Sequence, residues 1–441
     1  MPAAERCGKR LSPGIAALSL AALLACAPPA PLPKNSPKIP APVAKTASTP
    51  GDSQPTAPPS ATPWDETTPI VGDEVEVLAT KITASHRDQR GKAEAIYEWV
   101  AKNITYDIAA FLSGDLPNPA PLHVLATKSG VCEGYARLYV ALAEAAGLEA
   151  VMVTGFSKGF SPDDGGRKAE PDHAWCAVKF DGGWHLLDPT WGAGHIDETK
   201  KFVPSYSLNW FDTPPEQFVT SHLPEDSQWQ QLASPWSAEK FWTHPTVSQL
   251  YFHYGLKPQD QDDDTISMDG TSDLYLSSGR DCRLMAALYA DSQKVEGSYT
   301  LVERQGRDFH VAVSTPKAGR YRLVIFAGEP ESNRAESALV YNLDSGSGGP
   351  PFPQTLKTFT DEEVQLVAPR AALSRGRDTE LVLLAPGATA MMAVVGQEQI
   401  PFQKSGERFT LELEPKGDKV TVFGNYDGGD QYSGLVEFPV R

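Results

Sequence analysis

The sequence predicts an α+β core followed by two all-β sandwich domains. Up to about residue 245, helical apolar periods alternate with strand-like runs, which is typical of an α+β domain. Beyond that point a pattern of Phe-containing strand, Gly turn and Val-rich strand occurs twice, starting at Phe309 and again at Phe409. A repeat of about 100 residues predicts two tandem sandwiches of immunoglobulin-like size. We therefore divide the folded part into residues 64–245, 246–345 and 346–441.

Residues 1–25 have the composition of a signal peptide. Arg6, Lys9 and Arg10 precede an apolar run that is too short for an ordinary membrane-spanning helix. The run ends in Leu-Leu-Ala-Cys at Cys26. No later apolar stretch approaches the ~20 residues that a spanning helix needs.

The composition of residues 26–63 predicts an extended tether. Prolines recur throughout this segment, with Ala, Ser, Thr and Lys between them. Such a segment buries too little apolar surface to fold, and proline stiffens it into an extended chain.

The predicted core contains a helix that begins at Cys132 and ends at Gly147, with apolar residues at helical spacing. The unpaired N–H groups and the dipole at the start of a helix stabilise a thiolate. The backbone N–H of Cys132 could also donate to an oxyanion.

Three strands are predicted after this helix, at 149–156, 173–180 and 184–188. The last two form a hairpin, and His173 and Asp188 fall at the end away from its turn. Because the two arms differ in length, a bulge or the strand twist has to absorb the difference before the side chains can meet.

Cys132, His173 and Asp188 are therefore the candidate catalytic residues. An imidazole beside a thiol generates a nucleophile, and a carboxylate holds the imidazole in its productive orientation. Taken singly, a cysteine or histidine among apolar residues is more typical of a core position. The order of the three residues and their local settings together favour a catalytic role.

Three motifs resemble the transglutaminase-like superfamily of papain-fold cysteine enzymes: Gly-Val-Cys at 130–132, Asp-His-Ala-Trp at 172–175 and Asp-Pro-Thr-Trp at 188–191. The resemblance covers roughly residues 65–245. The flanking segments 95–107 and 206–229 are similar to bacterial relatives of the kyphoscoliosis peptidase type, in which paired β domains also accompany the core.

This resemblance implies a papain-like fold for the core, with Cys132 as nucleophile, His173 as general base and acid, and Asp188 as the orienting acid. Trp175 and Trp191 would be wall residues near the substrate site, although the burial of an indole explains them equally well. The resemblance implies no cofactor. The reactions of the family are peptide or amide cleavage, amide cross-linking and deamidation, and all pass through a thioester acyl-enzyme.

The Leu-Leu-Ala-Cys ending resembles a bacterial lipobox. It implies cleavage before Cys26 and attachment of lipid to that thiol, and the lipid anchors through its buried methylenes. With Ala27 next, the resemblance favours a place in the bacterial cell envelope at the outer membrane, facing the periplasm or the cell surface. The alternative is a plain secretory signal cut at an Ala site.

Charge and spacing argue against other classes of protein. A net charge of −17 repels nucleic acid and anionic headgroups, so we expect no nucleic-acid partner and membrane contact through the N-terminal lipid only. Asp260, Asp262 and Asp264 have calcium-loop spacing but lack the Gly and Glu that such a loop requires. The histidines lack a close ligand pair, so we expect no metal site. A disulfide between Cys176 and Cys282 stays an open alternative.

We therefore expect an envelope-anchored cysteine enzyme that acts on amide bonds of peptide or protein substrates in the cell envelope, with hydrolysis favoured. One alternative is a cross-linking transglutaminase or a deamidase. The other is a catalytically silent adhesion or scaffold protein that works through its β domains.

Overall fold

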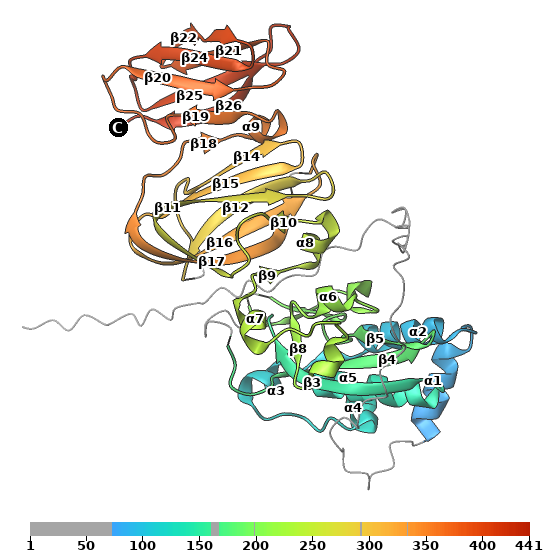
Figure 1. The fold of residues 1–441 in the computed structure, drawn as a ribbon. Helices are drawn as coiled ribbons and strands as arrows, with labels where there is room; N and C mark the ends of the chain where they lie inside the picture. The colour runs from blue at the N-terminus through green and yellow to red at the C-terminus, as the bar shows by residue number, and fades with distance from the viewer. Residues whose placement is uncertain (1–72, 160–166, 198, 292, 333) are drawn as a thin grey trace, which may run out of the picture.

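The computed structural model describes residues 73–159, 167–197, 199–291, 293–332 and 334–441. The predicted signal peptide, Cys26 and the predicted tether lie outside the described residues. Figure 1 shows an α+β core, a first β sandwich and a second β sandwich following one another along the molecule. The predicted fold class is thus confirmed.

Helix α5 (Cys132–Ala145) is the centre of the core. Tyr135, Leu138, Tyr139 and Leu142 have no exposed surface, because they pack between the sheet and the surrounding helices. Gly147 follows the helix with a φ of 79°, a conformation that glycine adopts without strain, so the predicted helix end is confirmed. The other helices on this side are α1 (Asp73–Thr83), α2 (Gln89–Asn103), α3 (Ile108–Ser113) and α4 (Pro121–Thr127).

The core sheet is antiparallel, in the order β5-β4-β3-β8. Its strands are β3 (Glu149–Ser157), β4 (His173–Phe180), β5 (Gly183–Leu187) and β8 (His222–Pro224). Nearly every residue of β4 is buried, since α5 covers one face of the sheet and a cluster around Trp175, Phe218 and Trp229 covers the other.

Short elements complete the core. Strand β1 (Thr105–Tyr106) pairs in parallel with β2 (Ser129–Gly130), and β6 (Gly194–Ile196) pairs with β7 (Phe202–Pro204). The remaining pieces are η1 (Leu208–Trp210), α6 (Pro215–Phe218), η2 (Ser227–Gln230) and α7 (Ala238–Thr243).

The first sandwich is built on strand path β13-β12-β16-β17-β11-β15-β14, with β9 paired to β17 and β10 paired to β11. Helix α8 (Gln249–Tyr254) packs against β16 and β17. The strands are β9 (Thr246–Val247), β10 (Lys257–Pro258), β11 (Thr265–Ser277), β12 (Arg283–Ala290), β13 (Gln293–Lys294), β14 (Thr300–Gln305), β15 (Asp308–Ser314), β16 (Gly319–Gly328) and β17 (Glu336–Gly348).

The second sandwich has two sheets, β18-β26-β25-β21-β22 and β19-β20-β24-β23, around its own apolar cluster. Helix α9 (Lys357–Asp361) packs against β26 and β14. The strands are β18 (Gln354–Thr355), β19 (Gln365–Ala368), β20 (Thr379–Leu384), β21 (Ala390–Val395), β22 (Glu398–Pro401), β23 (Gln403–Ser405), β24 (Arg408–Leu413), β25 (Lys419–Asn425) and β26 (Ser433–Pro439).

Cys176 and Cys282 are free thiols in separate apolar clusters. The disulfide that the sequence left open is therefore not formed, because each sulfur belongs to the interior of a different domain. Within the described ranges, no helix is both long enough and apolar enough to span a bilayer.

Candidate active site

Cys132 occupies the first turn of α5, as predicted. Its N-terminal neighbour Val131 is the N-cap, in an extended conformation and without a side-chain cap, so nothing from a capping side chain covers the first N–H groups. The preceding strand β2 is fixed by its pairing with β1, in which Tyr106 lies opposite Gly130. The thiol is half-buried at the edge of the helical cluster.

His173 and Asp188 meet, as the sequence predicts, at the open end of the β4–β5 hairpin. His173 Nε2 donates to Asp188 Oδ2 at 2.8 Å. The pairing is continuous from Cys176–Leu187 to Phe180–Gly183, so no bulge absorbs the difference in arm length. Instead the chain leaves the sheet at Asp188, whose N–H donates to Trp210 O at 2.8 Å.

The Cys132 thiol lies close enough to His173 to contribute to the raised pKa of that imidazole. Since the carboxylate of Asp188 takes Nε2, Nδ1 is the ring nitrogen left to face the thiol. The structure therefore brings all three predicted residues together in the order thiol, imidazole, carboxylate.

His222 is a further member of this group that the sequence reasoning did not assign to the site. Its Nε2 donates to the same carboxylate oxygen of Asp188, at 3.2 Å, and Ser221 Oγ lies 2.8 Å from its Nδ1. Both His222 and Asp188 are buried. His222 lies 34 residues beyond Asp188, in a three-residue strand. A strand this short shows no sequence period, so only the folded chain reveals the contact.

Asp188 is held as an ionised carboxylate. Burial alone raises its pKa, but the charge and hydrogen bond of His173, together with the hydrogen bond from His222, lower the pKa well below the usual range. Its other oxygen, Oδ1, accepts the backbone N–H groups of Thr190 at 2.8 Å and Trp191 at 3.1 Å. The predicted Asp-Pro-Thr-Trp motif thus forms a turn that closes on its own carboxylate.

The imidazoles of His173 and His222 differ in protonation state. Burial lowers the pKa of His173, but the charge and hydrogen bond of Asp188, with the contribution of Cys132, outweigh burial and raise the pKa to about 10. Burial also lowers the pKa of His222, and there it prevails over Asp188, leaving a pKa of about 4. At neutral pH His173 is the imidazolium and His222 is neutral.

The ligand atoms of His173, Asp188 and His222 lie within 4.8 Å of one another, a spacing that would also suit a metal ion. The same three atoms are joined by two hydrogen bonds to a single carboxylate oxygen. This arrangement fits an acid–base group held by hydrogen bonds.

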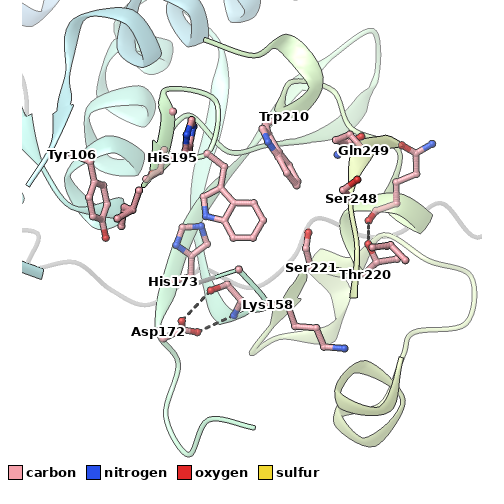
Figure 2. Close-up of a pocket in the computed structure, with 18 of the residues that line it drawn as sticks. Tyr106, Lys158, Asp172, His173, His195, Trp210, Thr220, Ser221, Ser248 and Gln249 are labelled. Carbon is pink, nitrogen blue, oxygen red and sulfur yellow. Dashed lines mark hydrogen bonds between the residues drawn. The ribbon is translucent and has the colours of Figure 1, made fainter. Parts of the chain in front are cut away.

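A cavity of about 130 Å³ opens beside His173. Figure 2 shows His173 and Tyr106 on the core side and Ser248 and Gln249 on the opposite side. Trp191, one of the two predicted wall residues, lines this cavity, with its ring 5.5 Å from that of His173. Trp175, the other, has no exposed surface and packs behind His173 and His222.

The other histidines considered from the sequence lie apart from the triad. His185 pairs with Asp212 at 2.7 Å and stacks on Phe180, on the outer strand of the sheet. His195 lies in β6 and lines the cavity, with Nδ1 buried and without a hydrogen-bond partner in the described chain.

Comparisons with known proteins identify relatives of the core and of the first sandwich. A family profile described as the transglutaminase-like superfamily matches residues 76–189, and one described as a KY-like, immunoglobulin-like domain matches residues 238–352. Human kyphoscoliosis peptidase is 31% identical over 271 residues, which cover 61% of this chain and 40% of that protein. Hillarin of Drosophila melanogaster is 29% identical over 184 residues, covering 38% and 22%.

Among solved structures, the crystal structure of a TGase is 21% identical, covers 32% of this chain and 35% of that one, and superposes with a TM-score of 0.22. The matched region spans well under half the length of the curated relatives.

Proposed function

The chain carries a transglutaminase-like domain followed by a KY-like, immunoglobulin-like domain and is homologous to kyphoscoliosis peptidase, and we propose that it is a cysteine enzyme. Its substrates would be amide bonds of peptides or proteins. The observation that carries the proposal is the grouping of Cys132, His173 and Asp188: the imidazole of His173 is hydrogen-bonded to the carboxylate, is close enough to the thiol for that group to raise its pKa, and lines a cavity.

The chemistry follows from the charge states. His173 is protonated in the resting site, and Cys132 Sγ attacks the carbonyl carbon of the amide as a thiolate. The new C–S bond forms as the carbonyl electrons move to oxygen, where the N–H groups at the start of α5 stabilise the negative charge. His173 gives its proton to the leaving amine, the C–N bond breaks, and a thioester remains.

Water then completes the cycle. His173, now neutral, takes a proton from water, the hydroxide adds to the thioester, and the acid leaves as the thiolate returns. Hydrolysis is favoured because the cavity beside His173 is open to solvent. A primary amine in place of water would give cross-linking, and mass spectrometry of products formed with and without an added amine separates the two outcomes.

His222 acts as a positioning residue in this proposal. A neutral imidazole that donates to Asp188 keeps the carboxylate ionised and fixed without adding a second positive charge beside His173.

The test is the pH dependence of Cys132 alkylation by iodoacetamide in the purified protein, with labelled peptides mapped to separate Cys132 from the other thiols. An imidazolium beside a thiol favours the thiolate, so an activated Cys132 is expected to keep its wild-type labelling rate from pH 9 down to pH 6. An ordinary thiol with a pKa of ~8.5 is only about 0.3% thiolate at pH 6. His173→Ala is therefore expected to label on the order of 100-fold more slowly there. Equal labelling rates in the two proteins at pH 6 would contradict the proposal that this protein is a cysteine enzyme.

We also propose attachment to the bacterial cell envelope through lipid on Cys26, with the outer membrane favoured. The motif lies outside the described residues, so this proposal rests on the sequence alone. Metabolic labelling with a palmitate analogue is expected to mark the wild type but not Cys26→Ala. Labelling that survives the substitution would contradict it.

A further inference from the structure

The cavity beside His173 is shared between two domains. The core supplies His173, Trp191 and Trp210, and the segment that leads into the first sandwich supplies Val247, Ser248, Gln249 and Phe252. Figure 2 shows Trp210 between His173 and Gln249. A substrate group that fills this cavity therefore contacts the general base and the immunoglobulin-like domain together.

The wall contributed by this segment is a fixed part of the sandwich. Strand β9 pairs with β17, where Val247 lies opposite Leu339, and Ser248 N donates to Ala338 O at 3.0 Å. Ser248 Oγ accepts the N–H of Leu250 and so caps α8. Gln249 and Phe252, one helical turn apart, present the same face of α8 to the cavity.

The opposite wall is aromatic. The indoles of Trp191 and Trp210 meet edge to face with centroids 4.8 Å apart, and Phe252 of α8 adds a third aromatic ring to the lining. The volume of about 130 Å³ is close to the roughly 150 Å³ of an apolar cavity that admits a benzene ring. One aromatic side chain therefore matches the space.

The far end of the cavity is polar. Gln217 and Gln249 line it, and within the described residues neither side-chain amide has a hydrogen-bond partner. The lining offers no unpaired carboxylate, since Asp172 pairs with Lys168. Its cations are the His173 imidazolium and Lys158, whose Nζ donates to His244 O at 2.8 Å. These features suit an uncharged group with an apolar body and a hydrogen-bonding tip, and disfavour a basic group.

We infer that this interdomain cavity is a specificity pocket for a tyrosine-like side chain of the peptide substrate, read on one side by Gln249 and Phe252 of the first sandwich. The ring would lie against the two indoles, and the hydroxyl would reach the free amides. This inference rests on the proposed function and names the substrate class of the same site.

The test uses peptidyl fluoromethyl ketones, which alkylate a catalytic cysteine and need no knowledge of the natural scissile bond. Tyr, Phe, Ala and Lys are placed in turn at the first and second positions before the reactive ketone. At one position the second-order labelling rate is expected to be highest for Tyr, about 3–10-fold above that for Phe, as one hydrogen bond predicts, and lowest for Lys.

Substitutions in α8 test which residues cause the preference for tyrosine. Gln249→Ala is expected to bring the ratio of the Tyr-probe rate to the Phe-probe rate near one. Phe252→Ala is expected to lower the rates of both aromatic probes relative to the rate of the Ala probe. His253→Ala, on the same helix but outside the cavity, is the matched control and is expected to keep the wild-type ratios. Iodoacetamide labelling, which needs no pocket, normalises every rate.

These experiments distinguish a failure of the proposed function from a failure of the specificity pocket. If iodoacetamide does not distinguish wild type from His173→Ala, the proposed function falls. If that labelling behaves as expected but Tyr and Ala probes react equally at both positions, or no peptidyl probe reacts, or the two α8 variants leave the ratios unchanged, the specificity pocket is wrong.

Discussion

Asp188 is held by four N–H groups, two from imidazoles and two from the backbone of its own turn. This crowding fixes the carboxylate, and the carboxylate in turn fixes His173. The sequence predicted the three triad residues because each carries a local motif. It did not predict His222, because a histidine in a short strand looks like any other buried polar residue.

We expect His222→Phe to lower kcat about 10-fold, because Phe keeps the ring volume but removes the N–H that steadies Asp188. The measurement is kcat and KM on a peptide substrate, with KM expected to change little. His185→Phe is the matched control, since it breaks a His–Asp pair of similar length elsewhere in the core. Equal kcat in the two variants would show that the contact is structural only.

At the scale of elements, the site depends on how closely β8 approaches β3. Gly155 of β3 pairs with Pro224, and a Cβ at 155 would lie 2.2 Å from Leu223 O and 2.7 Å from the ring of Trp175. Glycine is therefore required where the strand carrying His222 closes on the sheet.

Gly155→Ala is expected to push β8 outward, destabilise the core by about 1–3 kcal/mol and lower kcat with it. Thermal unfolding and kcat are the measurements. Gly183→Ala in β5 is the control, because its Cβ would meet nothing nearer than 3.6 Å. Wild-type stability in Gly155→Ala would show that β8 can relax without cost.

The elements that the sequence predicted and those it missed differ in a physical way. Strands β16 and β25 are the Val-rich strands of the repeat that begins at Phe309 and Phe409, and their composition predicts them as strands. Strand β12 reads RLMAALYA, a composition of strong helix formers, and β11 is interrupted by Asp, Ser and Gly. Their strand state comes from pairing with distant neighbours, which no local pattern records.

At the scale of the whole molecule, the two sandwiches are joined through a buried carboxylate. Glu303 of β14 accepts the N–H of Leu366 at 2.6 Å, Arg370 at 3.1 Å and His310 Nδ1 at 2.7 Å. Arg283 reaches Asp361 of α9 at 2.5 Å from the same side of the junction. Repeats in the sequence predicted two sandwiches, but polar residues scattered over β14, β15 and the following loop gave no indication of this junction.

Glu303→Ala is expected to loosen the junction and destabilise the second sandwich by about 2 kcal/mol, because it leaves buried donors unpaired. Small-angle scattering should show a broader distribution of lengths, and calorimetry an earlier transition. Glu437→Ala, which removes a partly exposed pair with Lys419, should cost less than about 1 kcal/mol. Identical behaviour of the two variants would refute the junction.

The same junction has a pH dependence of known sign. Burial lowers the pKa of His310, but hydrogen bonds to Glu303 and Asp273 outweigh it and raise the pKa above its usual value. A group with a raised folded-state pKa contributes stability that is complete below about 6.5 and is lost as pH rises through the folded value. The junction should therefore weaken as pH rises from about 6.5 through the folded-state pKa of His310 in the wild type, and His310→Gln should remove that dependence.

The separation of the cysteines bears on how the protein withstands oxidants. Cys176 and Cys282 are buried inside two different domains, whereas Cys132 is half-buried at the edge of the core cluster. Peroxide would convert Cys132 first to a sulfenic acid, since Cys176 and Cys282 are buried. A small external thiol would return that sulfur to the reduced state, and further oxidation would carry it to the irreversible sulfinic acid.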